Sequence, residues 1–592
     1  MFFYLDYRFK GTTLSSPKVV EKIPEPSELH EQHLFIQCGP QRLVSWEFAG
    51  DKLLILGDPI FNANKTIPAS ILQSSGSLDE SLLYERIKGH YYWFFFQDQE
   101  VRCGTSFGGI FPIYYEKNDH GIKICSSAFY LAEQKEHLTP SKRNLLERLL
   151  FNYTFFDSSW WEEILLLPAH RYLHLDKQGA GIEGEFEVSN YFGQVEDRSK
   201  DSLERLGALF QKETELFFPD APFAISLTGG FDGRTLVAAS LKANKSFKTY
   251  SFGRPGSSDV TVPDKQSQKL GISYYPIYLD QKYVREEALE AGNNFLSLTG
   301  YNGNFGRPHY EYAARQLSQE VDYILTGNFG SELFRALHLP GVMMSEALIT
   351  TFSAKDNSWK DVLKLKTAQW DSTFFEKELD ALISDLEQYQ KKRNDWDPNH
   401  KFYDFVFNEI FRKYFGPELV MQSHYFNNRT PYLNLEFFRE LNRTIWSGVH
   451  ARLFEKMKNK RMKGQMFYAS FIRQSHQKMY HLSTNKGYSP AEVMEKWRFP
   501  FLVSKVVMKK FIQKPEMDSN SVEAFFRKDY KKLAQHISPQ SPPFLTKHLQ
   551  RSHTEISRGQ NIQEWVRFYS ILVGWEAAQS AGSTISQSTI SS

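Results

Sequence analysis

Residues 222–240 read PFAISLTGGFDGRTLVAAS, and the interpretation of the chain starts from this stretch. A short apolar run ends in Thr-Gly-Gly-Phe-Asp-Gly-Arg, and an apolar helical pattern follows directly. Adjacent glycines let the backbone approach a ligand closely, and the N-terminus of a helix carries partial positive charge. A loop of this kind between a strand and a helix favours binding of a phosphate or pyrophosphate group.

The side chains of this loop suggest a division of roles. Thr228, Gly229 and Gly230 would hold the phosphate oxygens, and Arg234 would pair with phosphate directly. Asp232 would repel a bare phosphate, so we expect it to hold Mg²⁺ that bridges phosphate oxygens. The alternative is a tight turn whose glycines serve only packing, because short glycine motifs often occur by chance. The Walker pattern GxxxxGK[ST] is absent, so a nucleotide site here would be of another type.

The segments around the loop predict an α/β domain with a parallel sheet. Strand patterns alternate with helical patterns, as in βαβ units. The expected strands are 223–228, 247–253, 273–279 and 321–327, and the expected helices include 201–217, 233–243 and 262–271. The chain is mainly helical from about 340 to 580, and residues 581–592 form a Ser/Thr-rich tail that we expect to be disordered.

The first 200 residues predict a layered, β-rich domain. Short aromatic or β-branched runs are separated by turn residues at 98–99, 118–119 and 176–177. The expected strands include 33–38, 51–57, 91–97, 110–115, 121–127 and 170–176, and a helix is expected at 140–151. We therefore divide the chain into domains 1–200 and 201–580 and the tail 581–592.

Composition excludes several classes of function. The chain has 592 residues, which suggests two to four domains, and its 41% hydrophobic and 24% charged content is typical of a globular protein. A net charge of +2 gives no argument for nucleic acid or membrane. Cys38, Cys103 and Cys125 show no CxxC spacing, so neither a disulfide framework nor a zinc site is expected.

Two further features bear on location and partners. The apolar run at the N-terminus is too short for a signal peptide, and no apolar span of 18 residues follows, so we expect a cytoplasmic protein. The basic run EKMKNKRMKGQ (455–465) would suit nucleic acid, but it has no interleaved aromatics. We interpret it as a solvated helix face and expect no nucleic-acid partner.

With these segments in place, the chain resembles the asparagine synthetase family, which includes β-lactam synthetase and lasso-peptide cyclase. SLTGGFDGR (226–234) resembles its pyrophosphate loop S-G-G-x-D-S, and FGRPGSSD (252–259) resembles its adenine-strand segment. ILTGNFGSELF (324–334) resembles L-S-G-E-G-x-D-E-L-F, RTPYLN (429–434) resembles R-x-P-F-L-D, and NKGYSP (485–490) resembles K-x-G-F-x-x-P. In the first half, GGIFPIYY (108–115) and EEILLLPAHRYLHLD (162–176) resemble G-x-x-P-L-Y-Y and I-x-x-L-P-P-G-H. The motifs occur in the family's order along most of the chain.

The resemblance implies a fold and a set of site residues. It implies a glutaminase-like (Ntn-type) N-terminal domain followed by an ATP-pyrophosphatase domain, an α+β unit before an α/β unit. Ser226 and Phe252 would offer main-chain groups to adenine, and Thr326 and Gly327 would lie near the ribose and α-phosphate. Lys486 would neutralise charge in the adenylation transition state. On its local sequence alone, Lys486 reads as an ordinary solvated lysine.

The chain also departs from the family's patterns. The family's glutaminase needs a cysteine at the mature N-terminus, but residue 2 is Phe, and its glutamine-holding aspartate matches Ser106. We therefore expect no glutamine hydrolysis. In the ATP half, the magnesium-binding aspartate matches Ser331 and the functional glutamate matches Asn328. Either Asp232 and Glu332 hold the metal, with Glu332 also in a catalytic role, or adenylation is impaired.

The sequence predicts an ATP- and Mg²⁺-dependent ligase that adenylates a carboxylate and forms an amide bond, releasing AMP and pyrophosphate. Its substrates would be a small carboxylic acid or peptide and an amine or ammonia. A second hypothesis is asparagine formation from free ammonia, and a third is a pseudoenzyme that binds nucleotide or acts as a scaffold. Asp232 and Lys486 favour an enzyme, whereas Ser331 and Asn328 favour the scaffold. Whether the chain forms a homo-oligomer or docks a partner protein stays open.

Overall fold

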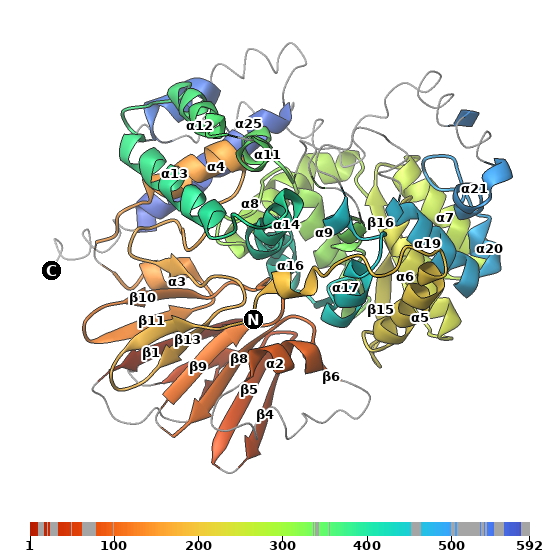
Figure 1. Cartoon of the computed structure of the whole chain (residues 1–592), viewed down its shortest axis with the longest axis horizontal. Coiled ribbons are helices and arrows are strands. Elements are labelled where there is room, and N and C mark those ends of the chain that lie inside the picture. Colours follow the sequence, from red (N-terminus) through yellow and green to blue (C-terminus); the bar gives the residue numbers. More distant parts are fainter. Residues whose placement is uncertain are drawn as a thin grey trace.

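The computed structural model describes most of the chain as a β-rich part, a parallel-sheet part and a set of helices (Figure 1). The described residues are 1–9, 17–20, 22–23, 33–48, 50–61, 79–98, 100–135, 137–334, 337, 343–354, 356–451, 463–498, 504–505, 533, 538, 541–549 and 562–581. The expected tail from 582 onward and residues 455–462 of the basic run lie outside them.

The N-terminal part contains two six-stranded sheets that pack on each other. The first has the order β12-β10-β11-β1-β3-β2 and the second β14-β13-β9-β8-β5-β4. Phe3 of β1 contacts Tyr92 and Phe94 of β8, with ring centroids 4.8 and 5.0 Å apart, so aromatic side chains join the layers. The strands are β1 (Phe2–Arg8), β2 (Lys18–Val19), β3 (Leu34–Gln37), β4 (Arg42–Phe48), β5 (Asp51–Gly57), β8 (Tyr91–Gln97), β9 (Glu100–Thr105), β10 (Tyr114–Lys117), β11 (Gly121–Cys125), β12 (Leu165–Leu166), β13 (Tyr172–Leu175) and β14 (Ala180–Glu183), with a separate pair β6 (Ile60–Phe61) and β7 (Ile87–Lys88).

The expected turns connect neighbouring strands of these sheets. Asn118 accepts hydrogen bonds from the backbone N–H groups of His120 and Gly121 and so closes the β10–β11 hairpin. Asp176 does the same for Gln178 and Gly179 between β13 and β14. The strand predicted at 110–115 is only partly correct, because β10 begins at Tyr114.

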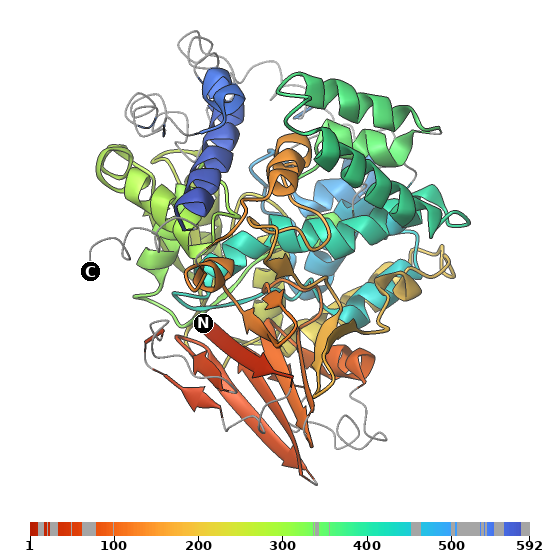
Figure 2. The same ribbon diagram turned by 90° about the vertical axis from the view of Figure 1, so that its left-hand side faces the viewer.

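Helix α4 (Lys142–Phe151) confirms the helix predicted at 140–151 but lies apart from the sheets. The Ser141 side chain accepts a hydrogen bond from the Asn144 N–H at 3.2 Å and caps the helix. The helix packs against α11 (Glu346–Ser353), α12 (Ser358–Ala368), α13 (Glu376–Lys391) and α25 (Ile562–Ala581) (Figures 1 and 2). A segment of the first 200 residues is thus enclosed by helices of the C-terminal half, and the domain division at residue 200 stays a prediction.

The second half contains a five-stranded sheet in the order β17-β16-β15-β18-β19, in which every neighbouring pair is parallel. Its strands are β15 (Phe223–Ser226), β16 (Lys248–Gly253), β17 (Ser273–Tyr278), β18 (Tyr323–Leu325) and β19 (Asn427–Arg429). The four predicted strands are confirmed, and β19, a short polar strand, was not predicted. Helices α5 (Ser202–Glu215), α6 (Asp232–Lys242) and α7 (Ser258–Leu270) occur where the pattern predicted them.

Helices account for most of the described C-terminal half, as predicted. The remaining helices are α2 (Glu80–Arg86), α3 (Ala128–Ala132), α8 (Ala288–Leu298), α9 (Pro308–Leu317), α10 (Gly330–Phe334), α14 (Pro398–Phe405), α15 (Phe411–Tyr414), α16 (Gly416–Gln422), α17 (Leu435–Asn442), α19 (Lys463–Ser475), α20 (Gln477–Tyr480) and α21 (Pro490–Met494). Within the described residues, no helix has the length and apolar character needed to cross a membrane.

Buried charges join the sandwich to the parallel-sheet part. Arg429, at the end of β19, forms a bidentate pair with Asp58, with N–O distances of 2.6 and 2.9 Å. Lys88 pairs with Glu213 of α5 at 3.3 Å, and both side chains are buried. Removing one partner of such a pair would leave a buried charge uncompensated, so these contacts fix how the two parts dock.

Candidate functional site

The junction between β15 and α6 positions the glycine loop. The buried strand ends at Ser226, and α6 begins at Asp232, so the loop spans five residues. Gly233, in the first turn of α6, has no room for a side chain, because a Cβ would collide with the carbonyl oxygen of Ser226. The helix therefore starts directly against the strand end, as the sequence pattern predicted.

A polar cavity of about 190 Å³ opens at the carboxyl ends of β15, β16 and β18. Strand β15 pairs with β16 on one side and with β18 on the other, so the strand order reverses here. Open α/β sheets bind ligands in the crevice at such a reversal. Six of the predicted site residues line this cavity, namely Ser226, Thr228, Asp232, Phe252, Thr326 and Gly327.

A chain of hydrogen bonds forms one wall of the cavity. The Thr326 hydroxyl donates to Asn428 at 2.9 Å, and the Asn428 amide donates to Gln422 at 2.6 Å. The amides of Gln422 and Asn328 donate to the same oxygen of Glu418, at 3.4 and 3.5 Å. Connected networks of this kind fix the orientation of each side chain in a buried site.

Glu418, on α16, is the acid in this network. Burial raises the pKa of its carboxyl group, while Arg307 and the two amides favour the charged form and lower it, and the net shift is upward. Its partner Asn328 acts as a hydrogen-bond donor to this carboxyl group.

Aromatic rings form another wall. Phe252, at the end of β16, contacts the ring of Tyr310 edge-on, with centroids 5.6 Å apart, and the ring of His309 at 5.1 Å. Tyr250 of the same strand and Tyr310 also line the cavity. The cavity is therefore apolar beside the backbone of β16, and the contact of Phe252 with adenine stays a prediction.

Asp232 and Glu332 lie on the side of the loop that faces α19. Tyr468 of α19 lies close to both carboxylates; burial, followed by Asp232, raises the pKa of its hydroxyl group. The Tyr432 hydroxyl donates to the backbone oxygen of Asp232 at 3.1 Å, and the Ser331 hydroxyl donates to Glu332 at 2.8 Å. Asp232 lines the cavity and Glu332 does not, and no group of three metal-ligating side chains occurs among the described residues.

Lys486 lies in a tight turn that covers the glycine loop. The backbone N–H of Gly487 donates to the Thr484 oxygen at 2.9 Å, and Gly487 has a φ of +88°, which favours glycine. The neighbouring Asn485 N–H donates to the Gly229 oxygen at 3.1 Å, and a Cβ on Gly229 would collide with Asn485. Lys486 itself is exposed and makes no hydrogen bond or ion pair with the residues that the structure describes.

The glycine loop and Arg234 differ in part from their predicted roles. The Gly230 N–H donates to the Thr228 hydroxyl at 3.3 Å, and neither Gly229 nor Gly230 lines the cavity. Arg234 is fully buried and donates to the backbone oxygens of Leu482 and Ser483 at 2.7 and 3.1 Å. The predicted contact of Arg234 with phosphate is wrong for this arrangement, because its guanidinium holds the segment that leads to Lys486.

Phe329 lies at the start of α10 in a conformation that L-residues rarely adopt. Its φ is +68°, and its ring is fully buried against Phe411 and Phe415, with a centroid distance of 4.2 Å to Phe415. Packing energy keeps the residue in this strained conformation. The adjacent Asn328 and Gly327 are thereby fixed at the rim of the cavity.

Sequence reasoning missed several residues of the cavity, among them Tyr250, Tyr310, Glu418 and Gln422. It also missed Asn428, which joins Thr326 to Gln422 in the hydrogen-bond chain. Glu418 and Gln422 lie four residues apart on α16, a spacing that places both on one face of a helix. Asn428 belongs to the unpredicted strand β19. The i, i+4 polar pair was a signal in the sequence, but nothing local connected it with the glycine loop.

The N-terminal sandwich has a packed core at the position where the family resemblance places a nucleophile. Phe2 is 4% exposed and contacts Tyr130 edge-on at 4.8 Å. The Ser106 hydroxyl accepts a hydrogen bond from the Tyr91 N–H at 3.3 Å. Cys103 and Cys125 are buried in the core, as predicted.

Comparisons with known proteins give little further information. No protein-family model matches the sequence, and no curated protein matches it. The solved structures that match in part include the glutamine phosphoribosylpyrophosphate amidotransferase from B. subtilis complexed with ADP and GMP, at 10% identity, and the allosteric regulatory enzyme of purine biosynthesis, at 11% identity. Each match covers 39% of this chain and about half of the other, 47% and 46% respectively, with a TM-score of 0.16, which is too low to support an argument.

Proposed function

We propose that the chain is an ATP-dependent ligase that adenylates a carboxylate and transfers the acyl group to an amine. The observation that carries this proposal is the cavity at the strand-order reversal, lined by six residues that sequence motifs had singled out. These residues come from three separate segments of the chain, around 226–232, at 252 and at 326–327. Their meeting at the carboxyl edge of a parallel sheet supports a nucleotide site.

The cavity suits the base and ribose of a nucleotide better than its phosphates. Phe252 and Tyr310 offer an apolar wall, and Ser226, Thr326 and Gly327 offer polar groups beside it. The phosphates would extend toward Asp232 and the turn that carries Lys486. In this proposal the buried Arg234 acts as a positioning residue, since it holds the backbone before that turn.

A magnesium ion bound with ATP would fit one carboxylate at the cavity wall. Mg²⁺ commonly takes one or two protein carboxylates, with phosphate and water oxygens completing its shell. Asp232 would be that ligand, with Glu332 behind it near Tyr468. The ion would supply neutralisation of phosphate charge; the chain's own contribution is to orient the nucleotide and to bring the Lys486 ammonium to it.

Two alternatives use the same cavity. An ammonia-using asparagine synthase would need aspartate as the acyl substrate, and the panel in the experiment below includes it. A pseudoenzyme that binds nucleotide is favoured by the contacts of Ser331 and Asn328, whose side chains are engaged with Glu332 and Glu418. The N-terminal sandwich would in either case serve as a structural unit or as a docking unit for a partner protein.

The first prediction tests the ligase proposal through Lys486. Lys486→Ala should lower ATP–pyrophosphate exchange driven by the correct acid by about 10²–10³-fold, or roughly 3–4 kcal/mol, because the ammonium meets charge that develops in the transition state. ATP affinity should stay within about three-fold, since that charge is weaker in the ground state. The measurement is isotope exchange with a panel of carboxylic acids that includes aspartate and peptides.

Lys478→Ala is the matched control, because Lys478 is an exposed lysine on the neighbouring helix α20. It should leave exchange unchanged. If the wild-type protein catalyses exchange and both variants lose it equally, the proposed role of Lys486 is contradicted. Intact ATP binding without exchange for any acid of the panel would favour the pseudoenzyme.

A further inference from the structure

A second cavity, of about 590 Å³, shares no lining residue with the nucleotide cavity, although Pro417 of the one and Glu418 of the other are consecutive on α16. Its walls come from α4 and the loop after it, from the segment before α9, from α15 and α16, and from α25. Figure 2 shows α4 and α25 side by side. The volume lies in the range of small-molecule sites.

The charged groups of this cavity are mostly cationic. Arg148, Arg307, Lys413 and Arg567 line it, together with a single acid, Glu564. Lys413 pairs with Glu409 at 2.5 Å. By contrast, Arg148, Arg307 and Arg567 form no ion pair with any residue in the described ranges. Glu147, Glu418 and Glu564 act on these arginines electrostatically without forming an ion pair with them, so the lining keeps more cations than acids.

Neutral partners orient these arginines. Arg148 donates to Asn144 at 2.7 Å and to Asn302 at 2.5 Å, and its guanidinium lies 4.2 Å from the centre of the Trp160 ring. Arg567 donates to Asn152 at 2.5 Å. Amide oxygens fix a guanidinium in place without cancelling its charge, so the remaining N–H groups stay available to an anion.

Arg307 is oriented by aromatic rings. Its guanidinium lies 4.8 Å from the centre of the Tyr414 ring and 5.8 Å from that of Tyr310. Stacking of this kind holds the flat guanidinium in one plane and leaves its edge free for hydrogen bonds. Together with the amide contacts of Arg148 and Arg567, it gives the cavity three preoriented cations.

Burial makes this arrangement costly. It lowers the pKa of Arg148 to about 10 and also lowers the pKa of Arg567. For Arg307, the neighbouring Tyr310, Tyr414 and Glu418 outweigh burial, and the net pKa shift is upward. A positive charge that is removed from water without a directly paired counter-charge destabilises the folded state. A bound anion would offset that cost and would be stabilised in return.

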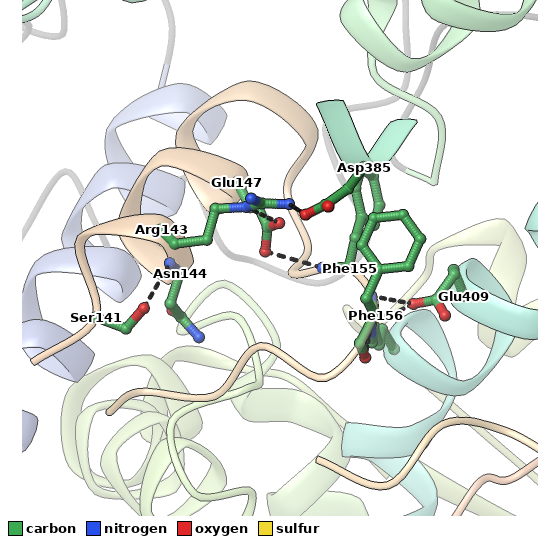
Figure 3. Close-up of polar contacts among 9 residues, drawn as sticks. Ser141, Arg143, Asn144, Glu147, Phe155, Phe156, Asp385 and Glu409 are labelled. Carbon is green, nitrogen blue, oxygen red and sulfur yellow. Dashed lines mark hydrogen bonds and ion pairs between the residues drawn. The ribbon is translucent and has the colours of Figure 1, made fainter. Parts of the chain in front are cut away.

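The wall between α4 and α15 is held in a fixed conformation. Asn152 and Phe156 have φ values of +75° and +55°, both rare for residues other than glycine. Buried Glu147 accepts a hydrogen bond from the Phe155 N–H at 3.0 Å, and Glu409 accepts one from the Phe156 N–H at 2.9 Å (Figure 3). These two carboxylates thus shape the loop beside the cavity, and a preformed wall lowers the entropic cost of binding.

We propose that this cavity is a binding site for a small ligand that carries a compact polyanionic group, either phosphate or several carboxylates. Arginine recognises both groups through paired N–H donors, which point charges such as lysine cannot reproduce. The tyrosines and asparagines of the wall would contact the remainder of the ligand. The proposal does not rest on the ligase activity, because the two cavities share no lining residue.

The test measures binding of inorganic phosphate and of citrate to the full chain by isothermal titration calorimetry. Wild-type protein should bind at least one of the two saturably. Arg567→Gln and Arg148→Gln should each weaken that binding by about ten-fold or more, the usual effect of losing a charge-assisted hydrogen bond. Binding of phosphate alone would assign a phosphate-bearing ligand, and binding of citrate alone would assign a polycarboxylate.

Two controls keep the test decisive. Arg315→Gln removes an arginine of α9 that pairs with Glu287 outside the cavity, and it should change affinity by less than about two-fold. Arg567→Lys retains the positive charge and should retain part of the binding. This variant shows whether Arg567→Gln loses binding because the charge is missing or because the protein is unfolded. No saturable binding to wild type, equal loss in Arg315→Gln, or loss in Asp232→Ala instead of Arg567→Gln would overturn the proposal.

Discussion

The two sheet regions differ at the places where the sequence suggests a site. In the N-terminal sandwich, Phe2 packs beneath Tyr130 in a closed aromatic core. At the end of β15, by contrast, polar side chains surround an open cavity and are oriented by a hydrogen-bond chain from Thr326 to Glu418. In the sandwich, the position where the family resemblance places a nucleophile is occupied by a packed side chain. At the end of β15, the corresponding positions carry polar groups that can bind a ligand. We therefore expect changes in the sandwich to affect stability and changes at the cavity to affect ligand binding.

The largest expected effect falls on the sandwich. Phe2→Ala should lower the free energy of unfolding by about 3–5 kcal/mol, because it removes a buried ring and leaves a cavity. ATP affinity at a temperature where the variant is folded should not change. Urea denaturation and calorimetric titration measure the two quantities. If folded Phe2→Ala protein no longer bound ATP, the proposed difference between the sandwich and the cavity region would be contradicted.

A smaller effect is expected at the start of α6. Gly233→Ala should destabilise the protein by about 1–3 kcal/mol, because the new Cβ would collide with the Ser226 oxygen. Helix propensity alone would predict stabilisation by about 1 kcal/mol, so the sign of the change is informative. Gly230→Ala is the matched control: its Cβ would have only Thr228 within 4 Å, at 3.5 Å, and the change should stay within about 0.5 kcal/mol. Equal effects of the two changes would contradict the close strand–helix junction.

A further prediction concerns how acid affects the stability of the contact between the sandwich and the C-terminal half. His170 accepts a hydrogen bond from the Gly108 N–H at 3.1 Å and lies 3.0 Å from Asn408; burial lowers its pKa to about 4. Between pH 6.5 and 4 the unfolded chain binds a proton at this position that the folded chain does not, so stability should fall as the pH falls. At pH 5 the cost is about 2 kcal/mol, from 1.5 units at 1.36 kcal/mol each.

His170→Gln should therefore lose about 2 kcal/mol less than wild type between pH 7 and pH 5, even if it is less stable at both. Urea denaturation at the two pH values measures this difference. An equal loss in the two proteins would show that His170 is not a source of acid sensitivity.

The sequence predicted the parallel sheet well because its signals are local. Apolar strands such as 223–228, turn residues such as Asn118 and the cap Ser141 act within a few residues of their own position. Strand β19 was missed because Asn427–Arg429 is polar, and its strand conformation depends on pairing with β18. The position of α4 among C-terminal helices depends on contacts with segments more than 190 residues away, which no local pattern reports.

The candidate site was predictable to a similar extent. The family resemblance, together with the glycine loop, singled out six residues that line one cavity. The sequence did not predict the direction of the Arg234 side chain, which depends on the backbone oxygens of Leu482 and Ser483. Glu418 was missed for the same reason, since only the fold brings α16 to the end of β15. The sequence did not predict the roles of residues that depend on a partner far away in the chain.

The most direct test of the account is titration of ATP into wild-type protein, Asp232→Ala and the control Asp264→Ala, each with Mg²⁺ and with EDTA. Asp264 lies on α7, does not line the cavity and pairs with Gln268. We predict that wild type binds ATP, that Asp232→Ala weakens binding by about ten-fold or more with Mg²⁺ and much less in EDTA, and that Asp264→Ala has no effect, because Asp232 acts through the metal. The same loss in both conditions would contradict the metal-ligand role of Asp232, and no ATP binding by wild-type protein would contradict the nucleotide site itself.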